Sequence, residues 1–226
     1  MVQLAGTVAH ELNNIFTAVN GNLSLLEESL QHQPESTGMI QDILKTARRG
    51  IELSQNLQAF AGRQALKRVT LDAGPVITAA VCRFRSPQFR EGIIELQLEP
   101  ERCLILIDPA KFEELVEELC RNAIAAGGAA FRLKIAVTRE TLTGEAESRL
   151  PPGRYVKFIF QDTGNGMSPE VLARALDPVF STSGRPNRGW GLAKCAGFIR
   201  QCGGDIFLES APRQGTCVKF YLPQRG

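Results

Sequence analysis

Three residues near the start of the chain have types and spacing suited to phosphoryl chemistry: His10, Glu11 and Asn14. Apolar residues recur every three or four positions from Leu4 to Leu30, which predicts an amphipathic helix. At about 100° per residue, His10 lies opposite the apolar stripe, and Asn14 shares its exposed face. A carboxylate can accept the ring proton of an exposed imidazole, which leaves a nucleophilic nitrogen, and an amide can position water for the reverse hydrolysis. By geometry alone, a solvated surface histidine is the simpler interpretation.

A second group of polar residues lies in the later part of the chain. Glu118 and Asn122 are four residues apart in an apolar-periodic segment, so they share one face of a predicted helix. An amide oxygen suits Mg²⁺ that is held mostly by phosphates and water, and the carboxylate could act as a base or order water. A solvated acidic face is the alternative for Glu118, and it suits Asn122 less well because apolar residues flank it.

Two glycine-containing segments follow. Asp162, Gly164 and Gly166 come directly after an apolar strand, which fits close approach of the backbone to a ligand, although an ordinary turn uses the same residues. The run Gly189-Trp190-Gly191 opens a predicted helix, where backbone N–H groups can hold a phosphate. The polar segment 177–188 before it is interpreted as a mobile lid. Its Arg185 and Arg188 could reach an anionic phosphate.

The elements that must position these residues fall into two parts. A second apolar stripe from Ile40 to Ala61 follows the turn at 31–37, which predicts a helical hairpin. One apolar face of such a hairpin stays uncovered, so we expect a homodimer that forms a four-helix bundle. From about Arg68, strands and helices mix, which predicts an α+β sandwich with helices on one face of a mixed sheet. We therefore expect two domains, residues 1–66 and 67–226.

Composition narrows the function classes. The formal net charge is +2, which argues against a general nucleic-acid or polybasic membrane binder. No apolar run is long enough to span a membrane and no signal peptide is present, so we expect a soluble, cytoplasmic chain. The six cysteines form no Cys-x-x-Cys pair, which favours free, mostly buried thiols in a reducing compartment over disulfides or zinc. The second histidine, His32, lies in the turn and is interpreted as structural or solvated.

The segment AHELNNIFTAVNGNLSLL (9–26) resembles the phosphoacceptor motif of two-component sensor histidine kinases. It is most similar to the subgroup found in hybrid and nitrogen-regulation-type kinases. The resemblance implies that His10 is the phosphorylated residue, that Glu11 is the base in phosphotransfer, and that Asn14 takes part in phosphatase chemistry.

The later motifs, taken in order, resemble the ATP-binding domain of the same kinases, the Bergerat fold shared with gyrase, the Hsp90 chaperones and MutL. The resemblance covers residues 4–224 and implies that the chain binds ATP and Mg²⁺. By that resemblance Asn122 would hold Mg²⁺, and Glu118, one turn earlier, would belong to the nucleotide site. Asp162 would accept the adenine amino group beside Gly164, Gly166 and Thr216, and Gly189, Gly191 and Leu192 would contact the phosphates.

The sequence departs from the family pattern in the phosphate loop. The usual Gly-Thr-Gly-Leu-Gly is replaced by a run that contains Trp190 and Ala193, and the usual Thr-Thr-Lys before the lid is Ser-Thr-Ser at 181–183. These changes keep open an ATP-independent phosphotransferase or pseudokinase with a weakened nucleotide site. A gyrase/Hsp90-type ATPase is a further alternative, which leaves the His10 helix unexplained.

The expected function is an ATP-dependent autokinase. It would phosphorylate His10 in a homodimer and pass the phosphoryl group to an aspartate of a response-regulator receiver domain, with phosphatase activity as a further expectation. No segment resembles a sensor or receiver domain, so we expect either an excised core or a kinase that receives its signal through a partner.

Overall fold

The computed structural model describes residues 12, 14–24, 26, 34–84, 92–128, 131–143, 150–181 and 189–225. The chain forms two compact units, Met1–Gln64 and Ala65–Gly226. This division lies two residues before the predicted boundary at 66/67, and the assignment of a function to each part stays a prediction.

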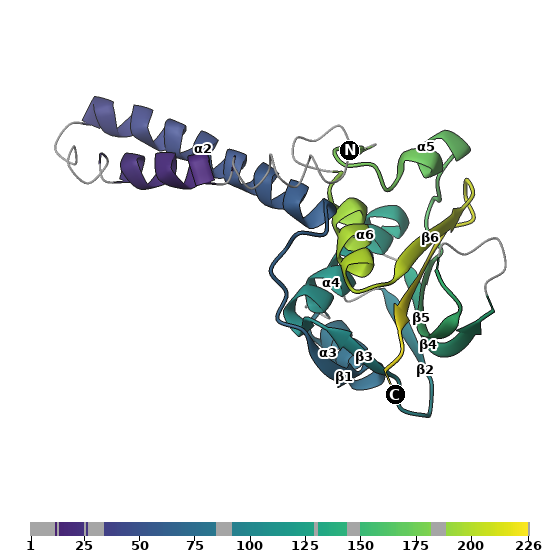
Figure 1. The fold of residues 1–226 in the computed structure, drawn as a ribbon. Coiled ribbons are helices and arrows are strands. Elements are labelled where there is room, and N and C mark those ends of the chain that lie inside the picture. The colour runs from purple at the N-terminus through teal and green to yellow at the C-terminus, as the bar shows by residue number, and fades with distance from the viewer. Residues whose placement is uncertain are drawn as a thin grey trace. The chain divides into compact units, whose positions relative to one another are not determined.

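The first unit is a helical hairpin, as predicted (Figure 1). The described residues between 12 and 26 are helical, and α2 runs from Pro34 to Phe60. The interior is formed by residues such as Ile40 and Leu44, which are 4% exposed. At Gly50 a Cβ atom would lie 2.5 Å from the ring of Phe16, so glycine lets this ring pack directly against the α2 backbone.

Helix α2 ends in a Schellman motif. Gly62 has φ +63°, its N–H donates to the Ala59 carbonyl, and the N–H of Arg63 donates to the Gln58 carbonyl. Glycine takes this left-handed conformation without a steric cost, which makes it the common residue just past a helix end. The helix therefore stops before the chain enters the second unit.

The hairpin also carries large apolar side chains that its own chain leaves exposed. Ile15 is 57% exposed and Ile43 is 48% exposed, although both belong to apolar-periodic segments. Single exposed apolar residues are ordinary, but five of the residues that the structure describes in this hairpin are large, apolar and exposed. They are Ile15, Val19, Leu26, Ile43 and Leu53.

The second unit contains a five-stranded mixed sheet and a separate two-stranded antiparallel ribbon. In the larger sheet, β2 and β4 are parallel and all other neighbours are antiparallel. The ribbon pairs β1 (Val69–Asp72) with β3 (Leu104–Ile107). The larger sheet has the spatial order β2 (Ile93–Leu98), β4 (Arg132–Leu142), β5 (Gly153–Asp162), β7 (Thr216–Pro223), β6 (Asp205–Ser210).

Helices cover one face of this sheet, which confirms the predicted α+β sandwich (Figure 1). Two elements were not predicted, the short strand β1 and the helix α3. The helices are α3 (Ala73–Phe84), α4 (Pro109–Gly127), α5 (Pro169–Arg174) and α6 (Gly191–Gln201).

The core between sheet and helices is aromatic at its centre. Phe158 of β5 stacks on Phe220 of β7 with ring centroids 4.6 Å apart, and Phe112 of α4 meets Phe158 edge-on at 5.5 Å. On β5 the inward positions alternate through Val156, Phe158 and Phe160, all buried. Because a strand repeats every two residues, the next inward position is Asp162.

All six cysteines are free thiols, as predicted, although Cys82 is exposed and three of the others are buried. Within the described ranges, no helix is long and apolar enough to cross a membrane.

Candidate functional site

Asp162 is a buried residue at the end of the central strand β5, and 9% of its surface is exposed. Its Oδ1 atom accepts two backbone hydrogen bonds, from Gly164 N at 2.8 Å and from Thr216 N at 3.1 Å. In the described part of the chain, its Oδ2 atom accepts none. Burial raises the pKa of this carboxyl above its ordinary value, and the two N–H donors only partly offset that rise. A fixed acceptor with one open oxygen is suited to an N–H donor of a ligand.

The two glycines after Asp162 fit the loop against neighbouring backbone. A Cβ atom at Gly164 would lie 2.5 Å from the Cβ of Ala126 in α4, and Asn165 N donates to the Ala126 carbonyl at 3.1 Å. Gly166 has φ +64°, and a Cβ there would lie 1.9 Å from the Ala211 carbonyl oxygen. Any side chain at these two positions would push the loop away from α4 or from the turn after β6. The glycines therefore fix where Asp162 and its loop sit.

Thr216 lies beside this loop, at the start of β7. Its hydroxyl is 3.0 Å from Ser210 Oγ, and Ser210 also donates to the Gly215 carbonyl at 2.8 Å. Ser210 Oγ in turn accepts the N–H of Met167 at 2.9 Å. Sequence reasoning missed Ser210, because a single serine at the end of a strand carries no pattern. It joins the loop after β5 to the turn between β6 and β7.

Glu118 and Asn122 lie one turn apart on α4. Asn122 is exposed and Glu118 is half-buried. A Cβ atom at Gly191, the first residue of α6, would lie 1.9 Å from Glu118 Oε1. The Glu118 carboxylate therefore occupies the space that any side chain at position 191 would need, which accounts for a glycine there. The fold thus brings Glu118 to the start of α6, a contact between segments more than 70 residues apart in sequence.

The N-terminus of α6 has no side-chain cap. Trp190 is the residue before the helix, its side chain accepts no hydrogen bond from the helix, and the first turn contains no acidic residue. Unpaired N–H groups at such an end attract anions, and the helix dipole adds to the attraction. Gly189 has φ +95°, and a Cβ there would lie 2.4 Å from the Phe180 carbonyl oxygen. Glycine is therefore required for the chain to pass this point and enter α6.

Comparison with known families assigns two parts of the chain, residues 1–65 and 107–226. Residues 1–65 match the family described as "His Kinase A (phospho-acceptor) domain". Residues 107–226, more than half of the chain, match the family described as "Histidine kinase-, DNA gyrase B-, and HSP90-like ATPase". The chain belongs to the histidine kinases.

Curated relatives of this histidine kinase are sensor kinases. It is 32% identical over 230 residues to "Sensor kinase CckA" of Brucella abortus (strain 2308), a match that covers 98% of this chain and 24% of that protein. It is 29% identical over 224 residues to "Sensor histidine kinase ZraS" of Klebsiella oxytoca, covering 99% of this chain and 46% of that protein. The chain thus spans between a quarter and a half of the length of these relatives.

Solved structures share the fold of the histidine kinase. Full-length ShkA in complex with AMPPNP superimposes with a TM-score of 0.64 at 21% identity, covering 99% of this chain and 46% of that one. The mycobacterial sensor histidine kinase MprB gives a TM-score of 0.55 at 19% identity, covering 70% of this chain and 98% of that one. At these identities the likeness concerns the fold.

The two residues that depart from the family pattern, Trp190 and Ala193, are both buried. Ala193 is 0% exposed and Trp190 is 5% exposed. The Ala193 methyl group is therefore packed in the domain interior, and it does not stand at the open end of α6. Partly buried Leu192 packs against the core cluster.

Several predicted site residues lie outside the described residues, namely His10, Glu11, Arg185 and Arg188. Asn14 is described and exposed on the first helical segment. The structure brings Asp162, Thr216 and both loop glycines together, and it brings Glu118 to Gly191. Within the described ranges, no three His, Cys, Asp or Glu side chains cluster closely enough to hold a metal ion by themselves.

Proposed function

We propose that the chain is an ATP-dependent protein-histidine autokinase that phosphorylates His10, with residues 1–66 as the phosphoacceptor and dimerisation domain and 67–226 as the ATP-binding domain. Bound ATP would supply the γ-phosphoryl group. The observation that carries the proposal is the open Oδ2 atom of buried Asp162, in a chain whose first 65 residues match a phosphoacceptor family.

Asp162 fits an adenine ring by donor and acceptor chemistry. Two backbone N–H groups hold the carboxylate in one orientation, so Oδ2 can accept the exocyclic amino group without losing rotational freedom on binding. Gly164 and Gly166 hold the backbone close beside it. A site built to accept one N–H donor discriminates strongly against a base that lacks it.

The phosphates would be held at the start of α6, beside Glu118 of α4. The uncapped N-terminus of α6, with Gly189, Gly191 and Leu192, offers N–H donors, and Arg185 and Arg188 supply positive charge. The Asn122 oxygen would hold Mg²⁺ together with phosphate oxygens and water, which are the oxygen ligands that this ion prefers. Glu118, half-buried beside Gly191, would order water or the metal there.

Phosphoryl transfer to His10 would depend on residues close to it in the sequence. Glu11 would take the ring proton and leave the other ring nitrogen as the nucleophile, which is general-base activation of a nucleophile. Because phosphoryl transfer relies on positioning and charge neutralisation, the linker between the two units must let them meet. An aspartate of a response-regulator receiver domain would then accept the group, and Asn14 would position water for dephosphorylation.

The exposed apolar residues of the hairpin support a homodimer. A second copy would cover Ile15, Val19, Leu26, Ile43 and Leu53 in a four-helix bundle. Because ATP is a cytoplasmic substrate, the reaction would take place in the cytoplasm.

Incubation of the purified chain with γ-labelled ATP and Mg²⁺ tests the proposal. We expect acid-labile label on the wild type and none on His10→Ala, with ATP affinity the same in both. Label that survives the His10→Ala substitution would mean another acceptor. Tight ATP binding with no label on the wild type would contradict autokinase activity.

A further inference from the structure

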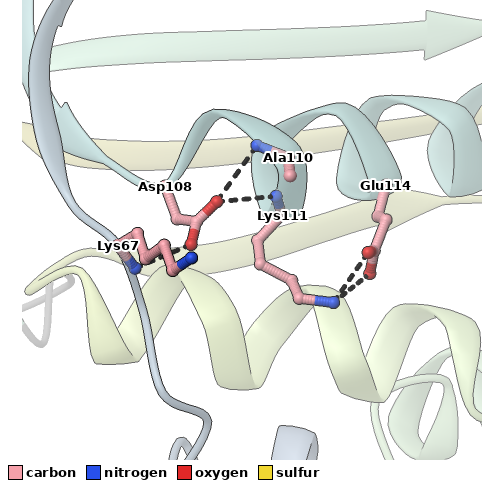
Figure 2. A network of polar contacts seen from close by, with 5 residues as sticks. All are labelled: Lys67, Asp108, Ala110, Lys111 and Glu114. Atoms are coloured by element: carbon pink, nitrogen blue, oxygen red, sulfur yellow. Dashed lines mark hydrogen bonds and ion pairs between the residues drawn. The ribbon is translucent and has the colours of Figure 1, made fainter.

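The segment that leads into the second unit is fastened to that unit at two points before its first strand begins. The N–H of Lys67 donates to Asp108 Oδ2 at 2.8 Å, and Arg68 Nη2 donates to the carbonyl of Gln201 at 2.6 Å. Leu66 packs against the core cluster. Figure 2 shows the first of these points, with Asp108 between Lys67 and the first turn of α4.

Asp108 is shared between this segment and the helix. Its Oδ1 atom accepts the N–H groups of Ala110 at 3.0 Å and Lys111 at 3.3 Å, so it caps α4, while Oδ2 is left for Lys67. The residue has extended backbone, φ −86° and ψ 116°, as an N-cap requires, and it is 8% exposed. Burial acts to raise its pKa, but the three N–H donors outweigh burial and hold the pKa below the ordinary value. The acceptor is therefore ionised throughout the physiological pH range.

The two fastening points lie at ends of the two helices that form the nucleotide site. Asp108 is at the N-terminus of α4, whose later turns carry Glu118 and Asn122. Gln201 is the last residue of α6, whose first residue is Gly191. A cation at a helix C-terminus is favourable for the dipole, so Arg68 suits its position. The same short segment is thus attached to both helices, at the ends away from the proposed phosphates.

We propose that Asp108 and the Gln201 carbonyl anchor residues 66–68, and that this anchor sets the rate of phosphoryl transfer to His10 without contributing to ATP affinity. The inference rests on the proposed function. Upstream, α2 stops at the Schellman motif around Gly62, so the tether between the helix stop and the anchor is residues 63–65. Three residues span at most about 11 Å, and release of the anchor would lengthen the tether to six residues and about 22 Å.

A longer tether lowers the effective concentration of one part at the other. That concentration falls with roughly the −3/2 power of tether length, so a doubling costs about threefold, and lost orientation costs more. Asp108 and Arg68 act here as positioning residues. Neither residue is among the proposed nucleotide contacts, so their removal is expected to change the transfer rate at saturating ATP and to leave the dissociation constant unchanged.

Asp108→Asn is the selective variant. The amide keeps an oxygen for Ala110 and Lys111 and places an NH₂ group opposite the N–H of Lys67, where two donors face each other. Arg68→Met removes the second point at an exposed position, and it carries the test if Asp108→Asn fails to fold. Lys111→Gln is the matched control, because it removes the ion pair with Glu114 in the same helical turn and leaves the linker contact in place.

The experiment measures three quantities on the full chain: the initial rate of label uptake at saturating Mg-ATP, the ATP dissociation constant by calorimetry, and hydrogen exchange of the Lys67 amide. For Asp108→Asn we expect faster Lys67 exchange, a rate at least about threefold lower, and a dissociation constant within about twofold of wild type. Lys111→Gln should match the wild type in all three.

An unchanged rate of label uptake together with faster Lys67 exchange would overturn the proposed anchor. A fall in ATP affinity that matches the fall in rate would also overturn it. A wild-type chain that takes up no label would overturn the proposed function itself, whatever Asp108→Asn does.

Discussion

Two aspartates of the second unit are almost equally buried, 8% exposed for Asp108 and 9% for Asp162, yet their pKa values move in opposite directions. Asp108 receives three backbone N–H groups spread over both oxygens. Asp162 receives two, both on Oδ1. Burial acts to raise both pKa values and does so more strongly at the Asp162 carboxyl, whereas at Asp108 the three donors, together with the charge of Lys111, outweigh it.

This difference in hydrogen bonding and pKa distinguishes a carboxylate that stabilises the fold, Asp108, from one that is available to a ligand, Asp162. Asp108 has its acceptor capacity used by its own chain, so it stabilises the fold and offers nothing outward. Asp162 retains an unused oxygen at a desolvation cost that its own chain does not fully offset. Buried polar groups left incompletely paired in a stable fold point to binding sites, and a shifted pKa supports the same conclusion.

The starts of α4 and α6 repeat the contrast. Asp108 caps α4, whereas α6 begins after Trp190 with no side-chain cap and no acid in its first turn. At the start of α4 the Asp108 side chain accepts hydrogen bonds from the free N–H groups. At the start of α6 no side chain does so, which leaves N–H groups for an anion.

The largest expected effect comes from Asp162→Asn. The amide keeps an acceptor for Gly164 and Thr216 but presents NH₂ in place of Oδ2, so a ligand amino group meets a donor. We expect ATP affinity to fall roughly ten- to a hundredfold, since a hydrogen bond to a charged group contributes about 1.5–3 kcal/mol. Calorimetric titration measures the change. Glu209→Gln, which removes an acid of an exposed ion pair, is the control and should bind as the wild type does.

Asp108→Ala should lower the free energy of unfolding and leave ATP affinity unchanged. Loss of an N-cap costs about 1 kcal/mol, and the unpaired Lys67 N–H adds to this cost. Urea unfolding followed by circular dichroism measures the loss. Ser168→Ala, which removes the longer 3.4 Å cap bond of α5, should cost less. Equal losses would contradict the double role of Asp108.

The two carboxyl groups should titrate on opposite sides of the ordinary aspartate pKa of about 3.9, as carboxyl-carbon NMR can show. Because the folded-state pKa of Asp108 is lowered, its stabilisation is complete above the ordinary value and is lost as the pH falls through the lowered one. For Asp162 the folded-state pKa is raised, so its contribution to stability is complete below the ordinary value and is lost as the pH rises through the raised one.

The raised pKa has a consequence for ligand binding. A protonated Asp162 has lost its charge, so ATP affinity should decline on acidification from a pH above the ordinary aspartate range. If ATP affinity declined only below the ordinary aspartate pKa, the open oxygen of Asp162 would not be the adenine acceptor.

The smallest effect should come from a matched pair at Leu192, in the first turn of α6. Glutamate and glutamine have the same shape, so Leu192→Glu and Leu192→Gln differ in charge alone. A negative charge at an open helix N-terminus competes with phosphate and contributes about 0.3–1 kcal/mol. ATP should therefore bind Leu192→Glu about two- to fivefold more weakly than Leu192→Gln, and equal binding would place the phosphates elsewhere.

Most of the fold was predictable because hydrophobic periodicity is a local signal. The mixture of strands and helices predicted after Arg68 is present, and β5 ends at Asp162. The helix α3 was missed because its segment AGPVITAAVCRF contains Gly and Pro near the start and β-branched residues within, which weaken helix propensity. Tertiary packing of Ile77 and Val81 against the core overrides that weakness.

For the site, sequence order indicated the residues but not their contacts. The spacing identified Asp162 and its glycines, yet the open Oδ2 depends on Thr216, which is 54 residues away. The contact between Glu118 and Gly191 likewise requires α4 and α6 to pack together. The double use of Asp108 carries no local sequence signal, because an aspartate before a helix is expected as a cap regardless of what its second oxygen does.

The parallel pairing of β2 with β4 has a consequence for the order of folding. Ile93 lies beside Arg132 in this pair, so the β3 strand and the whole of α4 must close as a crossover before the pair can form. Closing a loop of that length before its contacts form slows folding, whereas a helical hairpin forms from local contacts. During synthesis the N-terminal hairpin can therefore fold while the sheet is still incomplete, and the parallel edge is the step most exposed to misassembly.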